Sequence, residues 1–141
     1  MDVKLKPFSR SFFNTLSGKE AVLDPDRFEF TEYRTILVNG EKAGVVGMIF
    51  PKGDRSWGAI QIALEPRFRG KGLLQACEDM LASELKVYNL YATIEKENIH
   101  SINSHKRAGF RMLSEVDLKK IRKQGFLKES QVRLYKRLDN G

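Results

Sequence analysis

A short stretch near the middle of the chain combines positive charge with glycine. Residues 67–72 read RFRGKG, with three cations and two glycines, and apolar runs lie directly before and after them. The pattern predicts a strand, a glycine loop and the start of a helix. A helix N-terminus offers unpaired backbone N–H groups and a partial positive charge. We therefore expect an anion, such as a phosphate group, to bind at this junction.

Two familiar phosphate-binding motifs do not fit this stretch. A P-loop needs Ser or Thr after its Gly-Lys pair, and here Gly70 and Lys71 are followed by Gly72. The Rossmann fingerprint needs a third glycine at the position of Gln75. The pattern that remains is Arg67-x-x-Gly70-x-Gly72.

Composition limits the kind of protein that can hold this loop. The chain of 141 residues fits one domain, residues 1–141, and 41% of it is hydrophobic, which allows a real core. No apolar run approaches the roughly 20 residues of a membrane helix. The charged N-terminus lacks the apolar centre of a signal peptide, so we expect a soluble cytoplasmic protein without membrane contact. With one cysteine, Cys77, and two histidines, no metal centre is expected.

The elements that must position the loop follow from hydrophobic periodicity and turn signals. A strand is expected to end at Pro66, and an apolar stripe that includes Cys77 and Met80 predicts a helix with Glu78 on its polar side. Two β-rich runs around Asn39-Gly40 predict a hairpin. The order of the predicted strands and helices along the chain indicates a mixed α/β domain around one sheet. Strands are predicted within 3–8, 33–38, 41–50, 56–66, 87–95, 110–113 and 130–138, and helices within 9–16, 73–85, 98–109 and 114–125, with a further helix start at Asp24-Pro25.

Two segments together resemble a known family. Arg67-x-x-Gly70-x-Gly72, preceded by a strand, looks like the acyl-CoA pyrophosphate loop of the GNAT N-acetyltransferase superfamily. The segment 98–110 resembles the family's later helix, and its matching positions are Asn98, Ser101, Gly109 and Phe110. The two segments lie one strand apart, as in the family.

The resemblance implies a fold and a cofactor. The expected GNAT-like fold has a central mixed, mostly antiparallel sheet of about six or seven strands, flanked by about four helices. In this family a bulge splays the strand before the loop from the next strand, and the pantetheine of acetyl-CoA inserts there. Asn98 would bind the pantetheine arm or a nearby strand, or simply cap its helix. The implied cofactor-binding residues are Ile62, Ala63, Leu64, Arg67, Phe68, Arg69, Gly70, Lys71, Gly72, Leu73 and Asn98.

The catalytic residues are less defined by the resemblance. His105 occupies the position of the family's tyrosine, which protonates the departing CoA thiolate. An imidazolium with a reference pKa of about 6.5 could do the same, or His105 could be structural, with water or no acid serving that step. Glu65 is a candidate general base at a strand end, and Glu95 and Glu97 are alternatives. Cys77, on the apolar stripe, is predicted to be a packed core thiol rather than an acyl carrier.

The implied activity is transfer of the acetyl group of acetyl-CoA to a primary amine. The acceptor is open: a small molecule, a protein or an aminoacyl-tRNA, and a homodimer is possible. Aromatic residues before the loop could line an acceptor pocket or form ordinary core, and Trp57 could face either side of its strand. The alternative is a non-catalytic acyl-CoA-binding domain or a nucleic-acid-binding domain. The net charge of +7 and the basic segment 119–128 suit the latter.

Overall fold

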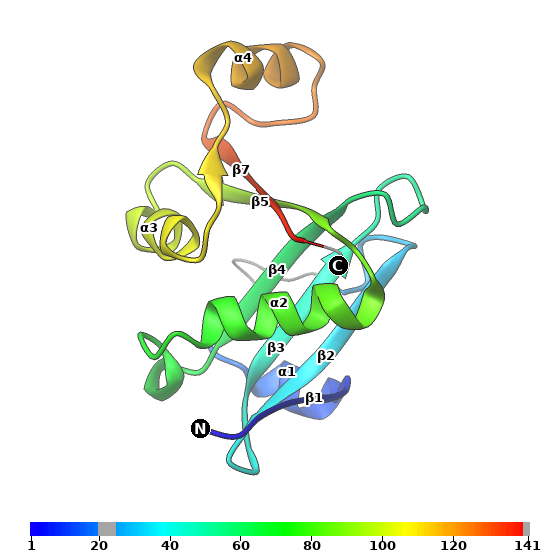
Figure 1. Cartoon of the computed structure of the whole chain (residues 1–141), viewed down its shortest axis with the longest axis vertical. Coiled ribbons are helices and arrows are strands. Elements are labelled where there is room, and N and C mark those ends of the chain that lie inside the picture. The colour runs from blue at the N-terminus through cyan, green and yellow to red at the C-terminus, as the bar shows by residue number, and fades with distance from the viewer. Residues whose placement is uncertain (20–24, 140–141) are drawn as a thin grey trace.

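A computed structural model describes residues 1–19 and 25–139, in which seven strands form one sheet (Figure 1). The strand order is β1-β2-β3-β4-β5-β7-β6. Only the β4–β5 pairing between these described strands is parallel, so the predicted mixed and mostly antiparallel sheet is confirmed. The strands are β1 Val3–Pro7, β2 Thr31–Val38, β3 Glu41–Ile49, β4 Gly58–Leu64, β5 Asn89–Glu95, β6 Arg111–Met112 and β7 Gln131–Arg137.

Four α-helices accompany the sheet in the described part of the chain. None of these helices is both long and apolar enough to cross a membrane. The helix expected to start at Asp24-Pro25 has its first residue, Asp24, outside the described residues, and residues 25–27 form a turn. The helices are α1 Arg10–Thr15, α2 Leu73–Leu85, α3 Ile99–Arg107 and α4 Glu115–Lys123, and a short 3-10 helix, η2, spans Pro66–Phe68.

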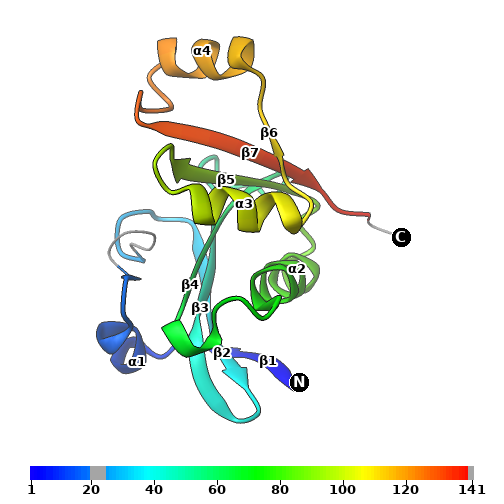
Figure 2. The same ribbon diagram turned by 90° about the vertical axis from the view of Figure 1, so that its left-hand side faces the viewer.

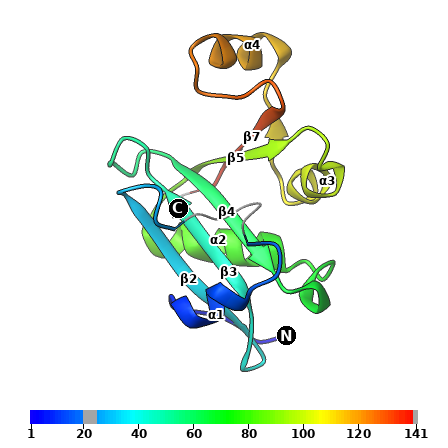
Figure 3. The same cartoon turned by 180° about the vertical axis from the view of Figure 1, so that it is seen from behind.

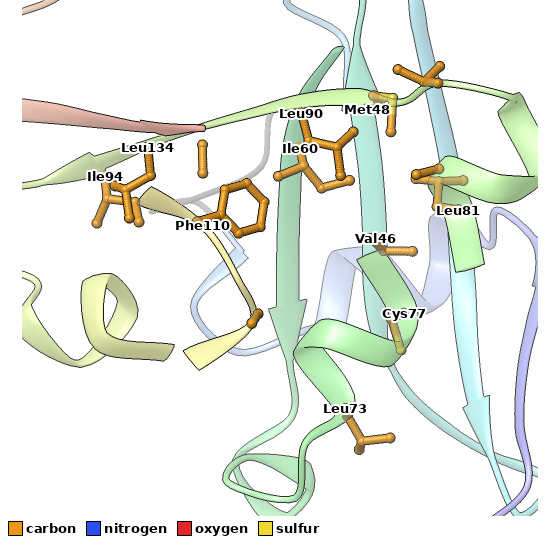
Figure 4. Close-up of a cluster of buried hydrophobic side chains, with 14 of the residues drawn as sticks. Val46, Met48, Ile60, Leu73, Cys77, Leu81, Leu90, Ile94, Phe110 and Leu134 are labelled. Atoms are coloured by element: carbon orange, nitrogen blue, oxygen red, sulfur yellow. The ribbon is translucent and has the colours of Figure 1, made fainter. Parts of the chain in front are cut away.

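One face of the sheet packs against α2 and carries the main core (Figure 4). Val46, Ile60 and Leu90 from three strands meet Cys77 and Leu81 from α2, and all of them are buried. The predicted stripe is confirmed at Cys77 and Leu81, because residues four apart lie on the same side of a helix. The prediction for Cys77 as a packed thiol is also confirmed, since no part of it is exposed.

The opposite face of the sheet is covered only in part. Figures 2 and 3 show α1 on the side of the sheet away from α2. Phe13 and Leu16 form a second buried cluster there with Tyr33, Val45 and Ala63 of the sheet. No described helix covers the same side of the start of β4, or of β5 and β7, and we call that surface the open face.

The aromatic residues expected near an acceptor pocket divide between the core and the surface. Phe13 and Tyr33 are buried in the second cluster, and Phe12 packs against it. Phe28 and Phe30 are exposed. The core interpretation therefore holds for the first three of these residues.

β4 and β5 separate soon after they start. Their parallel pairing is limited to Gly58 with Leu90 and Ala59 with Tyr91. β5 pairs along its whole length with β7 and diverges from the rest of β4 (Figure 1). The predicted splay is present. The bulge expected to cause it is absent on the β3 side, because the β3–β4 register runs without a shift.

Local sequence explains two tight features of the sheet. The hairpin between β2 and β3 turns at Asn39 and Gly40, whose φ angles are 51° and 83°, as a type I′ turn requires. Toward the end of β3, Gly47 lies beneath the ring of Tyr33 from β2. A Cβ atom at Gly47 would overlap that ring. Glycine therefore lets Tyr33 lie across β3 and donate its hydroxyl to Gln61 Oε1 of β4, at 3.0 Å.

This packing yields a test of stability. We expect Gly47→Ala to lower the free energy of unfolding by about 2 kcal/mol, because overpacking a core strains its neighbours. The same substitution in a Tyr33→Leu background should cost clearly less, since the ring that collides is gone. Urea unfolding of the four proteins in this cycle gives the comparison. An equal cost of Gly47→Ala in both backgrounds would contradict the contact.

Candidate cofactor-binding and active site

The glycine loop has the backbone shape that its sequence predicts. After β4 the chain makes the turn of η2 and then passes through Gly70 and Gly72, both with φ of 74°. Residues with a Cβ atom adopt this left-handed conformation only at a cost. Gly72 directly precedes Leu73, the first residue of α2. The two glycines thus bring the chain into the helix with its backbone exposed.

The loop is fixed by its side chains at one end. Phe68 is buried in the core, and the Arg67 guanidinium lies 4.5 Å from the centre of its ring. Arg67 also pairs with Glu41 at 2.6 Å, and Arg69 donates from Nε to the Leu64 carbonyl oxygen at 3.0 Å. Both arginines therefore stand at the rim of the loop and restrain it.

The other end of the loop is open and electropositive. A Cβ atom added at Gly70 or Gly72 would meet no atom within 4 Å. The first turn of α2 contains no acidic residue, and the exposed Lys71 adds a positive charge. The helix dipole and the first backbone N–H groups of this 13-residue helix point to the same space. The arrangement suits an anion with several oxygens.

The predicted contacts on β4 lie beside this loop. Ile62, Ala63 and Leu64 occupy the end of β4, where its edge toward β5 has no paired strand. An unpaired strand edge presents backbone N–H and C=O groups to a ligand. The structure thus places these three residues directly before the loop, with Ala63 buried in the second cluster and Ile62 and Leu64 half-buried.

Asn98 lies across the gap from β4, at the start of α3. Its side-chain oxygen accepts a hydrogen bond from the Ser101 backbone N–H at 3.1 Å, which is a helix cap. The capping alternative is therefore confirmed. Its contact with a cofactor stays a prediction.

A buried pair of ionisable side chains joins α2 to α3. Glu78 and His105 are 1% and 5% exposed, and Glu78 Oε2 lies 3.0 Å from His105 Nε2. His105 Nδ1 lies 2.9 Å from the Ser101 carbonyl oxygen. The prediction that placed Glu78 on the polar side of its helix was wrong. The sheet covers one side of α2, and α3 covers the side that carries Glu78. Met80, predicted on the apolar stripe, is 37% exposed instead.

Hydrogen-bond chemistry fixes the proton content of this pair. The Ser101 carbonyl can only accept, so Nδ1 carries a hydrogen. Nε2 and the Glu78 carboxyl group must then share one further proton. Without that proton, the lone pair of Nε2 would face a negatively charged carboxylate oxygen, and the two would repel each other. Burial raises the pKa of Glu78, and the hydrogen bond from His105 offsets this only in part. Burial alone would lower the pKa of His105, but the bond and charge of Glu78 outweigh it and raise that pKa.

The candidate catalytic residues stand at different distances from solvent. Both ring nitrogens of His105 are engaged with protein groups, and its role as a general acid stays a prediction. Glu65 follows β4 and is half-buried, and Glu95 ends β5, is exposed, and accepts from Gln131 at 3.3 Å. These two carboxylates flank the gap from its two strands, and neither role as a base is tested. Burial raises the pKa of the Cys77 thiol to about 12, which disfavours a nucleophilic thiolate.

The basic segment 119–128 lies away from the loop. It spans the end of α4, which stands at the opposite end of the molecule (Figure 1). Part of the segment has a structural role, because Leu127 is buried and Arg122 donates to the Gln131 carbonyl oxygen at 2.7 Å.

Comparison with known proteins identifies the family. Residues 4–110 match the Acetyltransferase (GNAT) family, and the chain belongs to it. Over 82 residues the chain is 30% identical to a spermidine N(1)-acetyltransferase of Escherichia coli K12, which covers 55% of this chain and 44% of that protein. The matched part therefore spans less than half of this curated relative.

Solved structures share the fold at low identity. The N-acetyltransferase PseH of Campylobacter jejuni, in complex with acetyl coenzyme A, superposes with a TM-score of 0.68 and 13% identity, over 98% of this chain and 100% of that one. An acetyltransferase of Bacillus subtilis in complex with CoA gives 0.68 and 19%, over 97% and 98%. This similarity establishes the GNAT fold.

The buried pair predicts a dependence of stability on pH. Below the ordinary histidine pKa of 6.5, the folded and the unfolded chain both hold the proton of the pair. The contribution of the pair to the free energy of unfolding is therefore fully present there. As pH rises from 6.5 through the raised pKa of the folded pair, the free energy of unfolding should fall by up to about 1.4 kcal/mol per pH unit. Denaturant unfolding between pH 6 and pH 9 measures the slope.

A matched variant isolates the contribution of the pair. In Glu78→Gln the amide can donate to Nε2 without a shared proton, so this part of the slope should disappear. Glu129→Gln, at an exposed position, should keep the slope of the wild type. Identical slopes in Glu78→Gln and the wild type would contradict the shared proton.

Proposed function

We propose that the protein is an N-acetyltransferase that transfers the acetyl group of acetyl-CoA to a primary amine. The observation that carries this proposal is the continuity of the glycine loop with the unpaired end of β4. A ligand that fills both features must have a multiply charged anionic part joined to a long arm with amide groups. The pyrophosphate and pantetheine of a coenzyme A thioester have this composition, and membership of the GNAT family supports the same ligand.

The loop would hold the pyrophosphate. Backbone N–H groups from Gly70 to the first turn of α2 would donate to its oxygens, and the Lys71 charge would lie near them. The open space over Gly70 and Gly72 leaves room for the two phosphates.

The pantetheine arm would occupy the gap between β4 and β5. Its amides would pair with backbone groups of Ile62, Ala63 and Leu64, much as an added strand does. From the other side, Asn98 would reach the arm with its side-chain NH2 group, since its oxygen caps α3. The thioester carbonyl would then lie where β4 and β5 begin to diverge.

The reaction follows from this placement. A neutral amine attacks the thioester carbonyl carbon, and a backbone N–H at the unpaired edge of β4 stabilises the oxyanion. The C–N bond forms, the C–S bond breaks, and the CoA thiolate leaves. Glu65 or Glu95 takes the proton of the ammonium through a chain of waters, because both lie at the ends of β4 and β5 away from the point of divergence. Both ring nitrogens of His105 are occupied by protein groups, so in this proposal His105 orders α3 against α2. Water protonates the CoA thiolate.

The loop assignment is tested by Gly70→Val. A β-branched residue strongly disfavours φ of 74°, and its side chain would project into the space proposed for phosphate. We expect acetyl-CoA binding, measured by isothermal titration, to be lost while the fold is kept. Gly125→Val is the matched control, because Gly125 has φ of 83°, has no atom within 4 Å of an added Cβ, and lies after α4.

The controls separate binding from folding. Both variants should lose a similar, small part of the unfolding free energy, on the order of 1–2 kcal/mol. Only Gly70→Val should lose acetyl-CoA. Unchanged affinity in Gly70→Val, or a folded wild type that does not bind acetyl-CoA, would contradict the proposed function.

A further inference from the structure

Three aromatic rings form a continuous surface on the open face. The rings of Trp57 and Tyr91 stand edge to face with centres 5.1 Å apart, and the rings of Tyr91 and Tyr135 are 5.0 Å apart. All three side chains are half-buried, although no described helix covers them. We call these three residues the aromatic wall.

Hydrogen bonds hold the wall in place. The Tyr135 hydroxyl donates to Asn89 Oδ1 at 2.7 Å, and Asn89 Nδ2 donates to the Ser56 carbonyl oxygen at 3.0 Å. Asn89 thereby ties Tyr135 to the residue directly before Trp57. A rigid aromatic surface binds a flat or apolar group with little loss of conformational entropy.

The wall borders the place where the reaction is proposed to occur. Tyr91 is paired with Ala59, the last residue of β4 that contacts β5 in the ladder. Beyond this pair the two strands diverge and the gap opens. An acceptor that lies against Tyr91 on the open face is therefore next to the proposed position of the thioester.

A half-buried arginine stands beside the wall without an acidic partner. Arg133 is paired with Thr93 across β5 and β7, two residues along from the Tyr91–Tyr135 pair, so its side chain is on the open face. It donates to Thr93 Oγ1 at 3.2 Å and to the Phe126 carbonyl oxygen at 3.1 Å. Burial lowers its pKa, yet an arginine stays charged at neutral pH.

Two of the other half-buried cations in the described residues have acidic partners, whereas the half-buried Arg122 donates to backbone carbonyl oxygens. Arg34 pairs with two glutamates, and Lys136 pairs with Asp79 at 2.8 Å. Among the described residues no ion pair involves Arg133. A desolvated guanidinium gains most from a carboxylate, which it can bind through two parallel hydrogen bonds. Arg133 thus has the properties of a ligand-binding group.

Two further arginines add positive charge to this face, and one glutamate, Glu95, opposes them. Arg111 is paired opposite Tyr135, and Arg137 is paired opposite Asn89, so both belong to the open face. Glu95, at the far end of β5, is bound to Gln131. A polycation would be repelled here, whereas an anionic group would be attracted.

We propose that this surface is the acceptor site, and that it selects a small aromatic amine that carries a carboxylate. The flat body of the acceptor would lie on the aromatic wall, the carboxylate would pair with Arg133, and the amine would face the gap. This inference rests on the proposed acetyl transfer. It assigns the acceptor to a class different from the polyamine in the name of the curated relative.

The first test is a binding measurement that needs no turnover. Trp57 is the single tryptophan of the chain, so its fluorescence reports directly on the wall. The probes are 4-nitro-L-phenylalanine and 4-nitrophenethylamine, which share a quenching ring and an amine and differ in the carboxylate. We expect the carboxylated probe to bind at least about tenfold more tightly, the effect of one charge-assisted pair.

Two charge variants decide whether Arg133 is responsible. Arg133→Gln should remove the difference between the probes and leave the affinity for 4-nitrophenethylamine nearly unchanged. Arg107→Gln removes the same charge from α3 and should keep the difference. Equal affinities of the two probes in the wild type, or a difference that persists in Arg133→Gln, would overturn the inference.

Acceptor turnover separates this inference from the proposed function. Release of CoA thiol with acetyl-CoA should be faster for L-phenylalanine than for 2-phenylethylamine, and slowest for spermidine. Faster turnover of spermidine, with acetyl-CoA binding intact, would overturn only the acceptor site. Absence of acetyl-CoA binding, with the quenching pattern as expected, would overturn the acetyl transfer and leave this surface as a binding site for the carboxylated amine.

Discussion

The early separation of β4 from β5 is the constraint on which the rest of the site depends. Two residue pairs join these parallel strands, and the remaining part of β4 keeps an unpaired edge inside an otherwise continuous sheet. Buried strand edges are costly when their backbone groups have no partner. A ligand with amide groups supplies such partners, and the glycine loop directly after β4 supplies the charge that an attached pyrophosphate needs.

The Glu78–His105 pair joins α2 to α3 in the core. α2 begins after the glycine loop and α3 begins after Asn98, so this contact relates the two segments that the proposed function assigns to the cofactor. The pair shares one proton and has both partners buried. A buried pair of this kind contributes little to net stability but fixes a unique arrangement, since breaking it leaves an unsatisfied charge.

Sequence predicted the parts of the site that depend on local chemistry. Gly70 and Gly72 were found because glycines before a helix can adopt positive φ and expose the backbone, and Asn98 because it matches a position of the GNAT helix segment. The burial of Glu78 was missed because helical periodicity shows one apolar stripe and cannot show that α3 covers a second side. The aromatic wall was missed for a similar reason: Trp57, Tyr91 and Tyr135 meet only through strand pairings that join distant segments. A homodimer and the identity of the base stay predictions.

The most direct test of the central claim is backbone hydrogen exchange with and without ligand. Coenzyme A should protect amides of both residues 70–75 and residues 62–64. Adenosine 3′-phosphate 5′-diphosphate has the pyrophosphate of coenzyme A but no pantetheine. It should protect only residues 70–75. That difference would place the pyrophosphate at the loop and the pantetheine at the unpaired edge of β4. Protection by coenzyme A that leaves residues 62–64 unchanged would contradict the account.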